Sequence, residues 1–114
     1  MVSMDRIRRA GRRIADRFHP DRVVLFGSYA EGTADEGSDV DLLIILPFKE
    51  RPFRKAIEIQ NYLNPDFACD VVVRRPEDVA RHYAEGDPLI REALDRGKVL
   101  YERHGAGMDR QGGG

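Results

Sequence analysis

The chain has 114 residues, of which 41% are hydrophobic and 34% are charged, and its formal net charge at pH 7 is -1. This length supports one hydrophobic core but not two, and the composition excludes a disordered chain. The near-neutral balance gives no overall attraction to nucleic acid. No apolar run is long enough to span a membrane and the N-terminus is charged, so we expect a cytoplasmic protein without a membrane association.

The first expected element is an amphipathic helix over residues 4–18. Apolar residues recur there at helical spacing: Ile7, Ala10, Ile14 and Phe18. Six arginines lie mostly on the other faces of this helix: Arg6, Arg8, Arg9, Arg12, Arg13 and Arg17. His19 precedes Pro20 and therefore avoids the helical region, which ends the helix.

Two short aliphatic runs, Val23–Phe26 and Leu42–Leu46, are expected to be buried strands. The connection between them has about 15 residues, is polar and glycine-rich, and lacks apolar periodicity. It predicts a loop with one short helix and not a full crossover.

Strands and helices alternate in the remainder of the chain. A second helix is expected over residues 51–64, started by Pro52 and stopped by Asn64-Pro65, with Phe53, Ile57 and Leu63 as its apolar residues. A strand over residues 69–73, two short helices split at residues 86–88 and an edge strand over residues 98–101 follow. This order predicts one α/β domain over residues 1–103, with a single sheet covered by helices. The glycine-rich tail, residues 104–114, is expected to be disordered.

Gly27 and Ser28 directly follow the first expected strand. A glycine there allows a sharp turn and a close approach to a ligand, and a serine hydroxyl can donate to a phosphate oxygen. The same dipeptide ends many ordinary strands, so on its own it also fits a plain turn.

Three aspartates lie at the starts of the next expected strands. Asp39 and Asp41 are two residues apart, so on a strand they leave the same face, while Asp70 opens the run 70–73. Adjacent carboxylates raise each other's pKa unless a cation lies between them, and an oxygen-only cluster suits Mg²⁺. The alternative is that Asp39 and Asp41 lie in solvent just before the strand, form a cap with Ser38 and bind no ligand. The single cysteine, Cys69, has no metal-ligand spacing and is expected to be a core residue.

Taken together, these residues carry a family resemblance. Gly27-Ser28, ten intervening residues, Asp39-Val40-Asp41, an apolar strand and the later Asp70 resemble the signature of the polymerase-beta-like nucleotidyltransferases. The GSYAEGT loop and the ending DPLIREALDRGKVLYE look most like the minimal nucleotidyltransferase branch, of the antitoxin type. The resemblance covers roughly residues 5–103 and implies an α/β (α+β) fold with a single mixed β-sheet flanked by helices.

The resemblance also implies a reaction and the residues that carry it. A nucleoside monophosphate, taken as AMP from ATP, would pass to an acceptor hydroxyl with two Mg²⁺ ions. Asp39 and Asp41 would bridge both ions, Asp70 would hold the ion that activates the acceptor, and Gly27 and Ser28 would hold the triphosphate. Two ions that clamp the attacking and leaving oxygens suit in-line phosphoryl transfer.

One residue departs from the family pattern. Many members have a basic residue at the position of Glu31, in the loop that meets the phosphates. We therefore expect either that the Glu31 carboxylate faces away from the site or that nucleotide affinity is reduced.

The chain contains no module that could select the acceptor, so the acceptor is expected to come from another protein or a second copy of this chain. Members of the branch resemble antitoxins encoded beside a small helical HEPN ribonuclease, one of whose tyrosines receives AMP. The main alternative is a non-catalytic interaction subunit that retains the fold. A third hypothesis, nucleic-acid binding through the arginine-rich helix, is disfavoured by the acidic balance and the absence of interleaved aromatics.

Overall fold

The computed structural model describes residues 1–103, so the expected disorder of the tail lies outside the described residues. Five helices and four strands follow in the order α1(Met4–Phe18), β1(Arg22–Phe26), α2(Ser28–Glu31), β2(Val40–Ile45), α3(Pro52–Leu63), β3(Cys69–Arg74), α4(Pro76–Ala84), α5(Pro88–Arg96) and β4(Lys98–Glu102). Every expected helix and strand is present within a few residues of its expected bounds. No helix among these residues has the length and apolar character needed to cross a bilayer.

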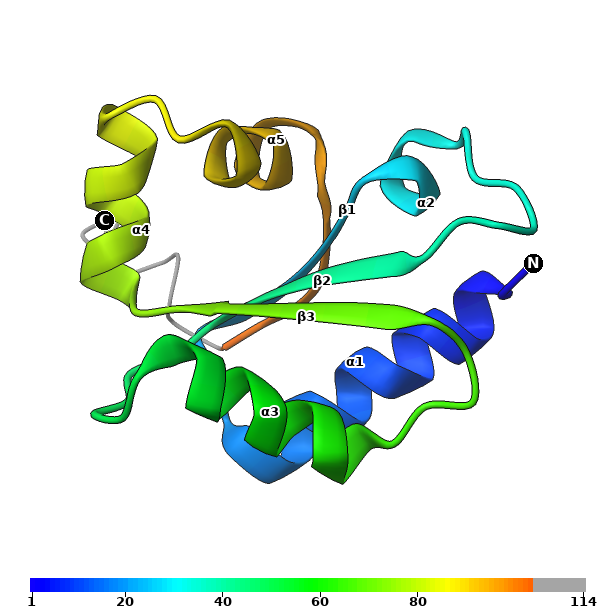
Figure 1. Cartoon of the computed structure of the whole chain (residues 1–114), viewed down its shortest axis with the longest axis horizontal. Helices are drawn as coiled ribbons and strands as arrows, with labels where there is room; N and C mark the ends of the chain where they lie inside the picture. The colour runs from blue at the N-terminus through cyan, green and yellow to red at the C-terminus, as the bar shows by residue number, and fades with distance from the viewer. Residues whose placement is uncertain (104–114) are drawn as a thin grey trace.

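The strands form one mixed sheet in the order β3-β2-β1-β4. β1 pairs antiparallel with β2 and β4, whereas β2 pairs parallel with β3. The parallel pair is possible because α3 returns the chain across one face of the sheet between β2 and β3 (Figure 1). The expected single mixed sheet flanked by helices is confirmed.

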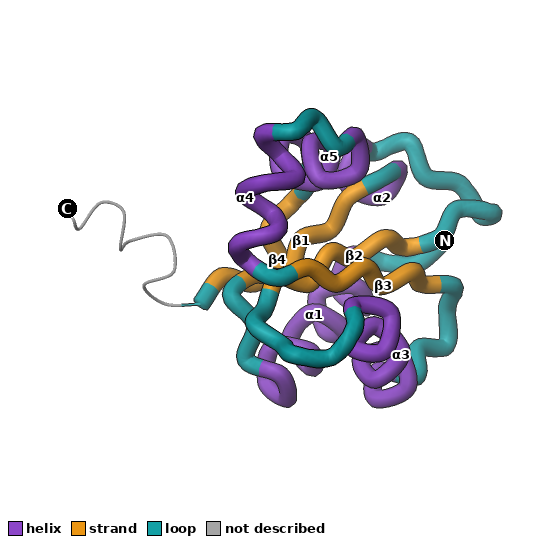
Figure 2. The backbone as a smooth tube through the Cα atoms, turned by 60° about the vertical axis from the view of Figure 1, so that its left-hand side comes forward, coloured by secondary structure: helices purple, strands orange, loops and turns teal. Residues whose placement is uncertain are grey.

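Helices cover both faces of the sheet (Figure 2). α1 and α3 pack on one face, where Ile7, Ile14 and Ile59 contact inward-facing strand residues such as Leu42 and Ile44. α4 and α5 pack on the other face, where Val79 and Ile90 contact Leu43 and Ile45. β2 is therefore apolar on both faces, as expected for the strand nearest the centre of an α/β sandwich.

The expected apolar face of α3 is partly wrong. Leu63 is buried, but Phe53 is 58% exposed and Ile57 is 52% exposed. The helix instead buries Ile59, which lies four residues before Leu63. Phe53 and Ile57 form a second apolar pair at the same spacing on a different side of the helix, and that side faces solvent.

Candidate active site

The turn after β1 is built around Gly27. Its φ of 76° and ψ of -157° lie in a region that side-chain-bearing residues rarely adopt. The carbonyl oxygen of Gly27 accepts hydrogen bonds from the backbone N–H groups of Ala30 and Glu31, at 3.0 and 3.1 Å. Ser28 begins α2 and remains partly exposed. The Gly27 turn therefore leads into α2 with Ser28 partly exposed at its start.

Asp41 lies directly against this turn. It is the register partner of Phe26 in the antiparallel β1–β2 pair, one residue before Gly27. A Cβ atom on Gly27 would collide with Oδ2 of Asp41. A side chain at position 27 would therefore force the Asp41 carboxylate to shift, which gives this glycine a second role that the sequence did not reveal.

Asp70 is the register partner of Asp41 in the parallel β2–β3 pair. The expected proximity of the second and third aspartates is therefore confirmed. Asp39 is exposed and lies one residue before β2, so it is not within the strand, although its two-residue spacing still directs it to the side of Asp41. Asp41 and Asp70 belong to the sheet face covered by α4 and α5, because Asp41 alternates with Leu43 and Asp70 alternates with Val72.

The electrostatics of the cluster are unfavourable without a counter-ion. Partial burial, followed by the negative charges of Asp70, Asp39 and Glu92 in that order, raises the pKa of Asp41 to about 6. Glu92, on α5, was not predicted from the sequence. Its position in a surface helix more than twenty residues after Asp70 gives no signal of its approach to the sheet.

The donor set fits a divalent cation by its chemistry. Asp39, Asp41 and Asp70 offer only oxygen atoms, as Mg²⁺ prefers, and the raised pKa of Asp41 marks negative charge that a cation would neutralise. As the side chains stand, no three His, Cys, Asp or Glu groups in residues 1–103 converge tightly enough to hold an ion. Asp39 and Asp70 are exposed, so their side chains are free to rotate toward a shared ligand.

Cys69, beside this cluster, is not part of it. Its side chain is partly buried with the core on the α1 and α3 face. Burial, followed by the charges of Asp70, Asp41 and Asp39, raises the pKa of the thiol to about 12. The thiol therefore stays protonated and is not a nucleophile at neutral pH. The expectation of a packing residue is met in part, because the side chain is not fully buried.

Glu31 faces α5. Its carboxylate Oε1 lies 3.6 Å from Nη1 of Arg96, and both side chains are substantially solvent-exposed. A cavity of about 400 Å³ lies between the two elements and is lined by Glu31, Pro88, Arg91, Glu92, Asp95 and Arg96. The negative charge of Glu31 is thus paired with Arg96 of α5, in a cavity that also contains Glu92.

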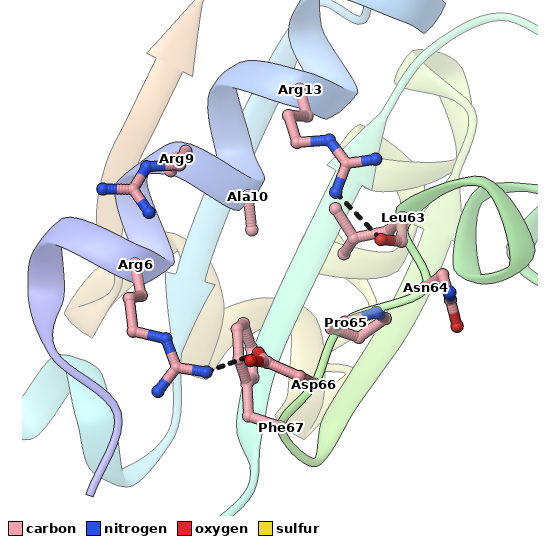
Figure 3. Close-up of a pocket in the computed structure, with 9 residues that line it drawn as sticks. All are labelled: Arg6, Arg9, Ala10, Arg13, Leu63, Asn64, Pro65, Asp66 and Phe67. Carbon is pink, nitrogen blue, oxygen red and sulfur yellow. Dashed lines mark hydrogen bonds and ion pairs between the residues drawn. The ribbon is translucent and has the colours of Figure 1, made fainter.

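A basic groove lies on the opposite side of the sheet (Figure 3). It has a volume of about 260 Å³ and runs between α1 and the segment that joins α3 to β3. Arg6 forms an ion pair with Asp66, and Arg13 Nη1 donates to the carbonyl oxygen of Leu63 at 3.0 Å. These two arginines therefore help to dock α1 onto the loop before β3. They are not freely available to a partner.

A solved structure shares this fold. The chain aligns with a crystal structure of a toxin-antitoxin complex with AMP-PNP at a TM-score of 0.56 and 19% identity, over 94% of this chain and 80% of that one. At this level of identity the likeness concerns the fold. The architecture is that of an α+β domain found in a nucleotide-bound complex.

The sequence itself shows the family. The model of the nucleotidyltransferase domain matches residues 7–100, and this chain belongs to that family. The span includes Gly27, Ser28 and the three aspartates.

Two curated relatives carry names of protein adenylyltransferases. MJ1305 of Methanocaldococcus jannaschii is 36% identical over 89 residues, which cover 71% of this chain and 58% of the relative. Protein adenylyltransferase MntA of Thermococcus cleftensis is 43% identical over 51 residues, which cover 44% of this chain and 50% of the relative. The chain thus spans about half the length of these relatives.

Proposed function

We propose that this chain is a Mg²⁺-dependent nucleotidyltransferase that transfers AMP from ATP to a hydroxyl group of a partner protein. The observation that carries the proposal is the pairing of Asp41 with Asp70 across β2 and β3, next to the Gly27-Ser28 turn. The names of MJ1305 and MntA support a protein as the acceptor, and the AMP-PNP in the structural neighbour supports an adenine nucleotide.

The proposed roles follow from the positions of the residues. Gly27, which lacks a side chain, lets the triphosphate approach the backbone, and the Ser28 hydroxyl donates a hydrogen bond to a phosphate oxygen. Asp39 and Asp41 would hold two Mg²⁺ ions, and Asp70 would hold one of them. These ions would neutralise the negative charge on the phosphate oxygens. The acceptor hydroxyl loses its proton to solvent and its oxygen bonds to the α-phosphorus, while the bond from that phosphorus to the oxygen bridging to the β-phosphate breaks and pyrophosphate leaves.

The proposed acceptor is a tyrosine of a small helical partner of the HEPN type, in which the chain acts as an antitoxin. A phenol has a pKa near 10 and therefore loses its proton more readily than an aliphatic alcohol. The exposed positions of Asp39 and Asp70 leave the cluster open to a side chain of another protein. The toxin-antitoxin nature of the structural neighbour supports such a partner.

Co-expression with the protein encoded beside this chain, followed by intact-mass measurement of that protein, tests the proposal. We expect a mass gain of one or more AMP units, absent when Asp39→Asn or Asp41→Asn is used. A stable complex without any mass change would instead support the second candidate, a non-catalytic interaction subunit. Glu31, an acidic residue in the phosphate loop, is the feature that favours this second candidate.

A further inference from the structure

β3 is an edge strand of the sheet, and its free edge is regular. Val40 N donates to Ala68 O at 2.9 Å, and Leu46 N donates to Arg74 O at 3.1 Å. These bonds direct the backbone groups of even-numbered β3 residues toward β2. The backbone groups of the odd-numbered residues, Cys69, Val71 and Val73, therefore point away from the sheet.

Two side chains cap part of this edge. Gln60 Nε2 donates to the carbonyl oxygen of Cys69 at 3.0 Å, and Nη1 of Arg74 donates to the carbonyl oxygen of Val73 at 2.9 Å. The central backbone groups, those of Val71, have no such cap among the described side chains. An edge with open backbone groups is a template for pairing with another strand.

The other edge of the sheet is protected in the ways that edges usually are. β4 begins with the exposed Lys98, and its pairing with β1 contains a register shift between Val23 and Val24. Its last residue, Glu102, forms an ion pair with Arg22 at 3.3 Å. Lysine and bulges both disfavour edge-to-edge association, and β3 carries neither.

Apolar side chains surround the β3 edge. A groove of about 340 Å³ runs along it, lined by β3 itself and by Pro52, Phe53, Ala56 and Leu89. Phe53, which lines this groove, is 58% exposed, and Ile57, one turn further along α3, is 52% exposed. The apolar surface of this groove is exposed to water, and a partner strand with its flanking helix would cover it.

We propose that two copies of this chain associate through β3, in antiparallel pairing about a two-fold axis at Val72. We compared three registers, with the two-fold axis at Asp70, at Val71 or at Val72, and the pairing of charged residues favours the last of them. An axis at Asp70 would oppose Asp70 to itself, and an axis at Val71 would oppose Asp70 to Val72. An axis at Val72 opposes Asp70 to Arg74 of the second copy twice, and Val71 to Val73 twice.

The pairing brings a residue of the second copy to the carboxylate cluster. In the isolated chain, the charged groups that act on Asp41 are Asp70, Asp39 and Glu92, all of them negative. Arg74 leaves the carbonyl oxygen of its own Val73, which accepts the backbone N–H of Val71 of the second copy. Its guanidinium then lies beside Asp70 of that copy. Each site in the dimer therefore gains an arginine that its own chain does not provide. The association itself uses backbone groups and does not depend on adenylyl transfer.

Cysteine cross-linking tests the register in full-length protein with Cys69→Ser. Residues that face each other across a non-hydrogen-bonded antiparallel pair have Cα atoms about 4.5 Å apart, within disulfide range. We expect Val72→Cys to give a covalent dimer on oxidation, and Val71→Cys and the β4 control Val99→Cys to remain monomeric. Cross-linking at Val71 would overturn the register, and cross-linking only at Val99, or at none of the three, would overturn the interface.

A charge exchange tests the same interface without cysteine chemistry. In metal-free buffer, sedimentation equilibrium of Arg74→Asp or Asp70→Arg should show a dimer dissociation constant raised about 10-fold or more, because like charges then face each other twice. The double variant with both substitutions restores the pairs and should return to within about 3-fold of the wild type. A wild-type chain that is monomeric throughout, or a double variant as weak as the single ones, would contradict the proposal.

Discussion

Asp41 and Asp70 are register partners in adjacent parallel strands, so two carboxylates share one face of the sheet next to the glycine turn that follows β1. Such a pair is unfavourable in a protein that lacks a cation, as the raised pKa of Asp41 records. The stability of the metal-free protein should therefore respond to the removal of either charge.

Asp41→Asn should stabilise the metal-free protein at neutral pH. The carboxyl pKa rises from 3.8 in the unfolded chain to about 6 in the folded one. Between these values the unfolded chain loses its proton first, so wild-type stability falls as the pH rises, and the loss is complete above about pH 6. The shift corresponds to at most about 3 kcal/mol, and screening at this partly exposed group reduces the expected gain to about 1 kcal/mol.

Urea denaturation in the presence of a chelator, from pH 3.5 to 7.5 in steps, measures this effect. The difference between Asp41→Asn and wild type should vanish near the acid end and reach its plateau above about pH 6. Asp16→Asn, at an exposed site on α1, is the matched control and should show no such pH dependence. A stability difference that is constant across the range would contradict the assignment of the carboxylate as the cause.

Gly27→Ala should damage the site, whereas Gly32→Ala should not. Both glycines have positive φ, 76° and 79°. Gly32 lies in the left-handed helical region, where alanine costs about 1 kcal/mol, whereas the ψ of -157° at Gly27 is nearly confined to glycine and costs about 1–3 kcal/mol. Only at Gly27 does the new Cβ meet the Asp41 carboxylate, because nothing lies within 4 Å of a Cβ at Gly32. We expect a further loss of about 1–2 kcal/mol for Gly27→Ala, because the carboxylate must shift.

Thermal melts of both variants with and without Mg²⁺ and ATP separate the strain from the site. Gly32→Ala should keep the ligand-induced rise in Tm, and Gly27→Ala should lose it. If both variants keep the rise, the Gly27 turn does not take part in ligand binding.

Asp70→Asn should impair transfer more than nucleotide binding. In the proposed reaction, Asp70 serves the acceptor and not the incoming phosphates. Calorimetric titration with a non-hydrolysable ATP analogue and Mg²⁺ should give a dissociation constant within a few-fold of wild type, while the transfer rate falls at least about 100-fold. Loss of nucleotide binding would show that Asp70 holds the nucleotide metal instead.

Glu31→Gln should strengthen nucleotide binding slightly. The substitution removes the partner of Arg96 and one negative charge from the end of α2. Because the pair is exposed and screened, we expect an affinity gain of about 2- to 5-fold, measured at low salt by the same titration. Glu36→Gln, in the exposed loop before β2, is the control and should have a smaller effect. Weaker binding by Glu31→Gln would mean that its carboxylate positions Arg96 for the phosphates.

The sequence revealed most of the fold and the main acidic residues, for identifiable reasons. The apolar runs of β1, β2 and β3 are continuous and bounded by glycine or charge, so their positions do not depend on tertiary contacts. The sequence did not predict which side of α3 packs against the sheet. Phe53 and Ile57 form one apolar pair and Ile59 and Leu63 another, and only the packing of α3 against the sheet decides which pair is buried.

The residues of the candidate site that the sequence did not predict were missed for the same reason, because tertiary packing brings them there. Glu92 and Arg96 lie on α5, whose approach to the cluster and to α2 is set by the packing of Ile90 and Ala93 on the sheet. No local spacing links α5 to Asp41 or to α2, both of which lie far earlier in the chain. The role of Gly27 in admitting the Asp41 carboxylate likewise depends on the β1–β2 register, which a single sequence does not display.

The central claim is that the Asp39, Asp41 and Asp70 cluster carries out nucleotidyl transfer. Its most direct test is incorporation of AMP from α-labelled ATP into the co-purified partner, with Mg²⁺ or with a chelator, by the wild type, Asp41→Asn and the control Asp16→Asn. We predict Mg²⁺-dependent label for the wild type and the control, and none for Asp41→Asn although it folds at least as stably. Undiminished label with Asp41→Asn, or label that persists in the chelator, would contradict the assignment.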